Sequence, residues 1–199
     1  MVKELNPKRN RPTKGLIITV SGPHGAGKST YAKALAEALQ LRYVCAGEFF
    51  RDLAKERGVT LETFSQIAAA DSAIDRVIDE RTKAEAKKGG VVIDAQLGAW
   101  MVKDLADLKV LIVAPDDVRF RRIAERDGIS IQEARKQTLA REAIQKQRYE
   151  KYYGLDVSDL SIYDLKIDTG LYPIDKTKSV VIESVRRLLN KNKLSGPQH

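Results

Sequence analysis

The sequence lacks the features of secreted and membrane-spanning proteins. Its 199 residues include one cysteine, Cys45, so no internal disulfide can form and a reducing, cytoplasmic location is expected. The longest apolar run, residues 15–20, is far too short to span a bilayer. The first residues are basic and polar and lack the apolar core of a secretory signal. We therefore expect no contact with a membrane.

Aromatic residues are scarce as well, at 6%, and no basic patch interleaved with aromatic side chains occurs. The net charge of +8 lies at the two ends: residues 1–14 carry five basic groups against Glu4, and residues 186–199 carry four and no acid. Residues 15–185 hold 26 basic and 26 acidic side chains. Nucleic-acid binding by this body is therefore not expected, although the ends, predicted as flexible tails at 1–14 and 191–199, could contact nucleic acid.

Short β-branched runs alternate with segments of helical periodicity along the chain. Strands are predicted at 16–20, 43–44, 91–94, 109–113 and 165–168. Helices are predicted at 28–40, 48–57, 61–70, 74–88, 116–126, 131–153 and 176–190. The strands do not alternate with polar residues, which is typical of a parallel sheet covered on both faces. The pattern predicts one three-layer α/β domain over residues 15–190.

The strongest local motif lies between the first predicted strand and the first predicted helix. It comprises Gly22, Pro23, His24, Gly25, Ala26, Gly27, Lys28, Ser29 and Thr30, which match G-x-x-x-x-G-K-[ST]. Glycines let backbone N–H groups surround phosphate oxygens, and the following helix directs its positive end at the same charge. Lys28 would reach the β- and γ-phosphates, and Ser29 would coordinate Mg²⁺. We assign His24 to a surface turn, because no carboxylate lies near it in sequence.

A phosphate loop alone does not specify a reaction, because GTPases, motor ATPases and small-molecule kinases share it. The guanine-reading N-K-x-D pattern of GTPases is absent, and translocating ATPases usually have longer chains. The size of the chain, its short strands and its arginine-rich late helices favour a nucleoside monophosphate kinase whose lid closes over two nucleotides.

Six segments, in the same order, resemble motifs of the cytidylate kinase family and of its archaeal branch in particular. They are Ala46–Arg51, Leu61–Ser65 with Asp71–Arg81, Leu97–Lys103, Arg141–Glu142, Arg148–Gly154 and Asp159–Leu165. The similarity runs from about Leu16 to about Asp168. It implies a P-loop NTPase fold with a helical monophosphate-binding insert at about 46–88 and a helical lid at about 126–150. Small-molecule nucleotides are the implied partners, and we expect a monomer.

The resemblance implies transfer of the γ-phosphate of ATP to CMP or dCMP, with Mg²⁺ and without a covalent enzyme intermediate. Lys28, Arg141 and Arg148 are the implied catalytic residues, and the two arginines, seven residues apart, share one helix face. Arg51 would clamp the phosphate of the acceptor. Asp94, at the end of the third strand, would hold a Mg²⁺-bound water or a substrate-site arginine. Without the motifs, the three arginines would be interpreted as solvated helix charges.

Two positions depart from the family pattern. Lys28 stands where the archaeal branch commonly has threonine, so this loop has the ordinary lysine and ATP is favoured as donor. The strand-3 motif [DE]-G-R reads Asp94, Ala95 and Gln96, so the acceptor-binding arginine is replaced by neutral Gln96. The loss of such a contact would weaken acceptor binding by about 1.5–3 kcal/mol. Two alternatives stay open: a kinase with a changed acceptor, and an RNA-associated NTPase that uses the basic tails.

Other residues have simpler expected roles. Cys45 is expected to be a small buried residue, and Trp100 to pack beside the substrate pocket. The helix predicted at 116–126 carries Arg119, Arg121, Arg122 and Arg126. Some of these are expected to face solvent or to pair with acidic neighbours. Arg122 and Arg126, one turn apart, are expected to border the lid.

Overall fold

The computed structural model describes residues 15–194, so the tail expected at 1–14 and positions 195–199 of the tail expected at 191–199 lie outside it. Five strands form one sheet in the order β2-β3-β1-β4-β5, and every neighbouring pair is parallel. They are β1 (Ile17–Ser21), β2 (Arg42–Cys45), β3 (Val91–Asp94), β4 (Leu108–Val113) and β5 (Leu165–Asp168). Each strand end lies within one residue of its predicted position. The predicted α/β class with a short parallel sheet is confirmed.

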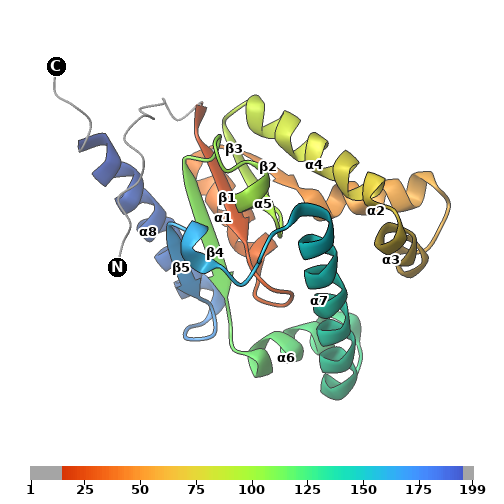
Figure 1. Cartoon of the computed structure of the whole chain (residues 1–199). Coiled ribbons are helices and arrows are strands. Elements are labelled where there is room, and N and C mark those ends of the chain that lie inside the picture. Colours follow the sequence, from red (N-terminus) through yellow and green to blue (C-terminus); the bar gives the residue numbers. More distant parts are fainter. Residues whose placement is uncertain (1–14, 195–199) are drawn as a thin grey trace.

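Some of the helices cover the two faces of this sheet, and others lie beyond one end of it (Figure 1). They are α1 (Lys28–Leu39), α2 (Ala46–Glu56), α3 (Leu61–Ala70), α4 (Ser72–Lys87), α5 (Gly98–Met101), α6 (Asp116–Asp127), α7 (Ile131–Tyr153) and α8 (Ile174–Leu194). A 3₁₀ turn, η2, covers Leu160–Ile162. The prediction missed α5, which is a single turn and too short to show a helical period. It also missed the true end of α8: residues 191–194 were expected in a tail, yet no Gly or Pro ends the helix before Gly196.

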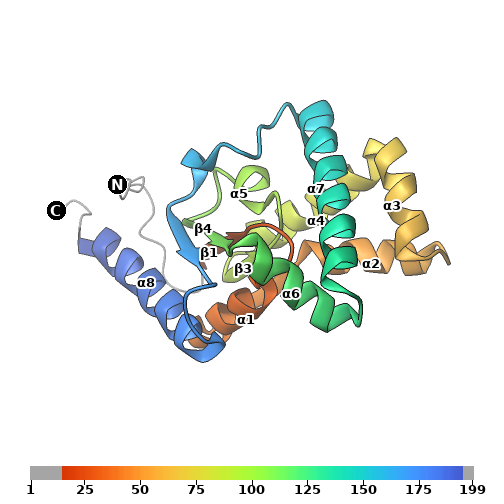
Figure 2. The same ribbon diagram turned by 90° about the horizontal axis from the view of Figure 1, so that it is seen from below.

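Two apolar layers sandwich the sheet. On one face Ile18 and Val20 of β1 pack with Tyr31 and Leu35 of α1 and Val181 of α8. On the other face, the side chains of β1 and β3 that point away from α1 pack against α4 and the segment around α5. Figure 2, viewed from below, shows α1 and α8 on one side of the sheet and α5 on the other. This arrangement explains why the strands are apolar on both faces.

The helices α2, α3 and α4 form an excursion between β2 and β3 with a small core of its own. Phe64 is fully buried there beside Ile74, and its ring meets that of Phe50 edge to face at 4.8 Å. Thr60 caps α3 by accepting the N–H of Thr63, and Asp71 caps α4 by accepting the N–H of Ala73; threonine and aspartate are residue types that favour such positions. The helix α7 follows α6 and lies beside this excursion, where the Tyr152 hydroxyl donates to the carbonyl oxygen of Ala69 (Figures 1 and 2).

Candidate active site

The glycine-rich loop connects β1 to α1 at the carboxyl edge of the sheet. Gly22 has φ +146°, and a Cβ added there would lie 1.9 Å from the carbonyl oxygen of Ile112 in β4. Gly27 has φ +90°, and an added Cβ would lie 2.8 Å from the Tyr31 ring. Any side chain at these positions would push the loop off its neighbours. The two glycines therefore hold the backbone close to the sheet, immediately before the amino end of α1.

Lys28, the first residue of α1, folds back over the loop. Its ammonium group donates to the Pro23 carbonyl oxygen at 3.1 Å. Desolvation lowers the pKa of Lys28, whereas the charges of Asp94 and Glu142 oppose this shift. The Lys28 ammonium group is thus held at the loop by one neutral carbonyl oxygen, which an anion such as a phosphate could replace as the acceptor.

Ser29, Asp94 and Tyr43 meet beside the loop. The Ser29 hydroxyl donates to Oδ2 of Asp94 at 2.5 Å, and the Tyr43 hydroxyl donates to the same oxygen at 3.0 Å. Asp94 is the last residue of β3 and is buried. Burial, followed by the Asp94 charge, raises the pKa of Tyr43, so this hydroxyl remains a donor. Tyr43 was missed from the sequence, because the contact depends on β2 lying next to β3.

The Ser29 and Asp94 pair fits a magnesium ion in its donor chemistry. Hydroxyl and carboxylate oxygens are the ligands that Mg²⁺ prefers, and this ion commonly takes one or two of them and completes its shell with water and phosphate oxygens. Within residues 15–194, no group of three or more His, Cys, Asp or Glu side chains could hold a metal. A site with few protein ligands and a bound polyphosphate is consistent with both observations.

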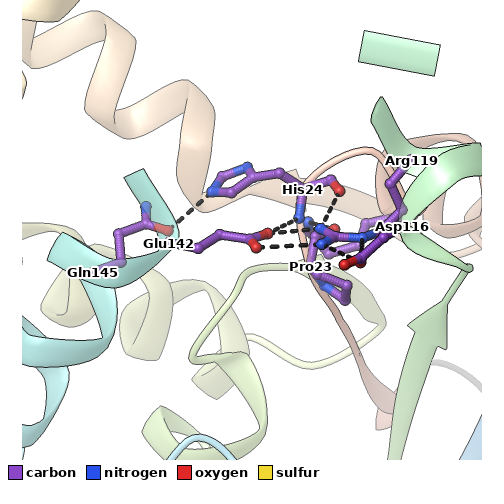
Figure 3. Close-up of polar contacts among 7 residues, drawn as sticks. Pro23, His24, Asp116, Arg119, Glu142 and Gln145 are labelled. Atoms are coloured by element: carbon purple, nitrogen blue, oxygen red, sulfur yellow. Dashed lines mark hydrogen bonds and ion pairs between the residues drawn. The ribbon is translucent and has the colours of Figure 1, made fainter. Parts of the chain in front are cut away.

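The helix α7 contacts the phosphate loop at His24 (Figure 3). The Glu142 carboxylate accepts the backbone N–H of His24 at 3.0 Å, and the Gln145 side-chain oxygen lies 2.9 Å from Nε2 of the same residue. Arg119 of α6 donates to the His24 carbonyl oxygen at 2.8 Å and to Glu142 at 2.7 Å. His24 lies in a turn, as expected, but it is half-buried there, and its partners come from α6 and α7, more than 90 residues away.

Arg141 and Arg148, both expected in the lid, occupy different surroundings. Arg141 is exposed, but it lies near enough to lower the pKa of both His24 and Lys28. Arg148 is nearly buried and pairs with Asp75 of α4, with its Nε 3.0 Å from the Asp75 Oδ2. Of the two arginines, the structure brings Arg141 towards the phosphate loop and Arg148 to the α2–α4 excursion.

Arg51, expected to clamp the acceptor phosphate, and Gln96, expected at the same substrate site, have no polar partners in the described part of the chain. Arg51 is exposed on α2, and its Nη1 is 3.5 Å from where a Cβ on Gly47 would lie. Gln96 is half-buried two residues after β3, in the turn that leads to α5. Both are free to contact a ligand.

The remaining arginines of α6 divide as expected between solvent and specific contacts. Arg126 pairs with Asp127, and exposed Arg121 pairs with Asp117. Arg122 instead donates to the carbonyl oxygen of Thr169 at 2.7 Å, which ties α6 to the segment after β5. Arg119, which no spacing rule singled out, is the buried member of the set at 4% exposure.

The other two expectations concern packing. Trp100 meets the Tyr163 ring edge to face at 5.6 Å, and Cys45 is buried. Both findings agree with structural roles.

No helix within residues 15–194 is long and apolar enough to cross a membrane.

Solved structures with a similar fold include small-molecule kinases. The chain superposes on a shikimate kinase from Acinetobacter baumannii with a TM-score of 0.59 at 16% identity, covering 92% of this chain and 100% of that one. A gluconokinase from Sinorhizobium meliloti gives a TM-score of 0.56 at 18% identity, covering 93% and 99%. Together with the glycine-rich loop between β1 and α1, this likeness shows the three-layer fold of P-loop NTPases.

Sequence similarity narrows the class further. The chain is 47% identical over 174 residues to a cytidylate kinase from Staphylothermus marinus, which covers 87% of this chain and 98% of the relative. A cytidylate kinase from Pyrococcus furiosus is 44% identical over 177 residues, covering 89% and 92%. The chain belongs to the cytidylate kinase-like family, whose model matches residues 17–171. The resemblance found in the motifs is thereby confirmed.

Proposed function

We propose that this protein is a nucleoside monophosphate kinase that transfers the γ-phosphate of ATP to CMP or dCMP, giving ADP and CDP or dCDP. The observation that carries the proposal is the Ser29–Asp94 contact beside the glycine-rich loop, in a chain that belongs to the cytidylate kinase-like family. Phosphoryl transfer needs alignment and charge neutralisation more than covalent chemistry, and a loop with one lysine and an oxygen-ligand pair supplies both.

On the donor side, the residues from Gly22 to Thr30 bind the phosphates of ATP. Backbone N–H groups of the loop surround the phosphate oxygens, and the amino end of α1 adds its dipole. Lys28 exchanges the Pro23 carbonyl oxygen for the β- and γ-phosphates. Ser29 and Asp94 would hold Mg²⁺, Asp94 directly or through a water molecule. The ion would neutralise negative charge that develops on the phosphates during transfer.

On the acceptor side, Arg51 clamps the phosphate of CMP as a bidentate donor, since it is exposed and lacks an ion-pair partner among the described residues. Gln96 contacts the acceptor from the end of β3 as a neutral hydrogen-bonding group. Arg141 stabilises the transferred phosphoryl group, as its position near Lys28 favours. Arg148, which lies at the junction of α7 and α4, also acts as a catalytic arginine of the lid. Closure of this lid excludes water and suppresses wasteful ATP hydrolysis.

A coupled assay of ADP release with CMP, dCMP, UMP and AMP, each with ATP and Mg²⁺, tests the proposal. We expect turnover with CMP and dCMP well above the ATP-only blank, and little with AMP. Turnover with UMP or AMP alone would indicate that Gln96 has changed the acceptor. An absence of CMP and dCMP turnover, combined with RNA-stimulated ATP hydrolysis, would favour the RNA-associated NTPase instead. The Lys28→Ala variant controls for contaminating kinases.

A further inference from the structure

The contact between Glu142 of α7 and the phosphate loop places a carboxylate next to an anion site. Glu142 Oε1 accepts the His24 backbone N–H at 3.0 Å (Figure 3). Backbone N–H groups of such loops bind phosphate oxygens. The carboxylate is an anion with similar acceptor geometry, so it offers the loop an internal substitute for a phosphate.

The local charge balance makes this arrangement costly to a bound nucleotide. Arg119 pairs with both Asp116 and Glu142, at 2.8 Å and 2.7 Å. One guanidinium therefore serves two carboxylates, and the cluster keeps one net negative charge. The charge of Glu142 reaches the phosphate-binding lysine, since it raises the pKa of Lys28 against the larger effect of desolvation. Phosphates that enter the loop would meet this charge at close range.

The same helix makes a second contact with the same loop residue. Gln145, three residues after Glu142, lies 2.9 Å from His24 Nε2 through its side-chain oxygen. Burial, followed by the charges of Arg141 and Lys28, lowers the pKa of His24 to about 4. The imidazole is therefore neutral at physiological pH and donates from Nε2 to the Gln145 oxygen. Two hydrogen bonds from α7 to one residue hold the helix on the loop.

The neighbour of Glu142 carries the opposite charge. Arg141 is exposed and lies near Lys28 and His24. Polyphosphate in the loop would attract Arg141 and repel Glu142. The contact between Glu142 and the loop would then be replaced by a contact between Arg141 and the phosphates.

We propose that Glu142 is an internal latch: it holds α7 on the phosphate loop when the loop is empty, and the phosphates of the donor displace it. The inference rests on the proposed function only in requiring that the loop binds a polyphosphate. It adds a step in which lid and loop separate at His24 before Arg141 can reach the phosphates. Because this step precedes acceptor binding, it can be tested without CMP.

Calorimetric titration with inorganic tripolyphosphate, which has neither base nor sugar, measures the competition directly. Glu142→Gln keeps an acceptor for the His24 N–H and removes the charge. We expect it to bind tripolyphosphate about three- to tenfold more tightly than the wild type. Glu150→Gln, an exposed position on the same helix, is the matched control and should change affinity less than about twofold. Equal or weaker binding by Glu142→Gln would refute the latch.

A crystal structure of the full chain with tripolyphosphate provides the second readout. We expect the separation between His24 N and Glu142 Oε1 to open from 3.0 Å to beyond hydrogen-bonding distance. If the contact is retained in the complex, the proposal is wrong even when the affinities change as expected. A negative charge near the loop would weaken anion binding without being displaced. If Glu142→Gln does not fold, Glu142→Asp, whose charge is withdrawn by one methylene, should tighten binding by a smaller factor, and unchanged binding would refute the latch. Loss of CMP turnover alone would leave these results intact and would refute only the acceptor assignment.

Discussion

Arg148 Nε lies 3.0 Å from Asp75 Oδ2, and the two side chains are 11% and 10% exposed. This ion pair joins the late part of α7 to α4, and the Tyr153 hydroxyl donates to Asp79 one turn further along both helices. The earlier part of the same helix contacts His24 in the phosphate loop. One helix thus touches the excursion and the loop, so its position couples the two parts of the molecule.

Arg148→Ala should affect both stability and turnover. Removal of one partner of a buried pair leaves Asp75 uncompensated, which typically costs about 3–5 kcal/mol of the free energy of unfolding. We also expect kcat for CMP phosphorylation to fall more than the KM for CMP rises, because a lid arginine acts mainly in the transition state. Denaturant unfolding and steady-state kinetics measure the two effects.

The double variant Asp75→Asn, Arg148→Ala separates the two roles of Arg148. It removes the unpaired carboxylate, so stability should recover while kcat stays low. Recovery of kcat together with stability would show that Arg148 acts only through the fold.

Lys28→Ala should remove most of the kinase activity. The ammonium group is held at the loop by the Pro23 carbonyl oxygen, and its proposed role is to neutralise charge on the β- and γ-phosphates. We expect kcat to fall about 10²-fold or more, as for the loss of other transition-state donors. Lys178→Ala, a surface change on α8, is the control. Near-normal turnover by Lys28→Ala would mean that the loop is not the catalytic site.

Asp94→Asn should change the requirement for Mg²⁺. The substitution keeps the shape of the side chain and removes the charge that faces Ser29 and Tyr43. We expect the half-saturating Mg²⁺ concentration to rise about 10- to 100-fold, measured at saturating ATP and CMP. Asp117→Asn, at an exposed position of α6, should leave it unchanged. An unaltered Mg²⁺ dependence in Asp94→Asn would remove this residue from the metal site.

The junction of α4 and α7 should make stability depend on pH. Burial raises the pKa of Asp79 to about 6, although the Tyr153 hydrogen bond opposes the shift, and burial raises the pKa of Asp75 too. Because the folded state binds these protons more tightly than the unfolded chain, stability is greatest below about pH 4 for this contribution and falls as pH rises towards 6. Asp79→Asn should therefore gain about 1–2 kcal/mol at pH 7.5 relative to the wild type.

Urea unfolding of both proteins at pH 4.5 and 7.5 checks this prediction. Asp175→Asn, at a solvated position of α8, controls for net charge. A larger gain for Asp79→Asn at the lower pH would contradict the assignment.

Gln96→Arg should strengthen acceptor binding if CMP is the substrate. Gln96 has no polar partner among the described residues, and a guanidinium here would add a charge-assisted contact to the acceptor phosphate. A gain of 1.5–3 kcal/mol corresponds to a KM for CMP lower by roughly 10- to 150-fold. Gln96→Ala, which removes a neutral hydrogen-bonding group, should raise KM by a smaller factor. A higher KM in Gln96→Arg would show that the end of β3 does not face the acceptor.

Much of the fold follows from local patterns in the chain. The apolar β-branched runs place all five strands, and Thr60 and Asp71 end up as the caps that their residue types favour. The glycine-rich loop could be recognised because its chemistry depends on residues that are consecutive in sequence. Single-turn α5 and the last turn of α8 were not predicted, because neither contains enough residues to establish a period or a stop signal.

The sequence by itself determined the class of the protein, the phosphate loop and the family, because these depend on periodicity and on motifs of neighbouring residues. Only the tertiary structure decided which distant charges meet. It brings Tyr43 into contact with Asp94, Arg148 with Asp75, and Glu142 with His24. Pairs like these are separated by 51 to 118 residues, and they form because the sheet order and the α7 packing bring the elements together. Sequence spacing carries no information about such contacts, since they are set by the packing of whole elements.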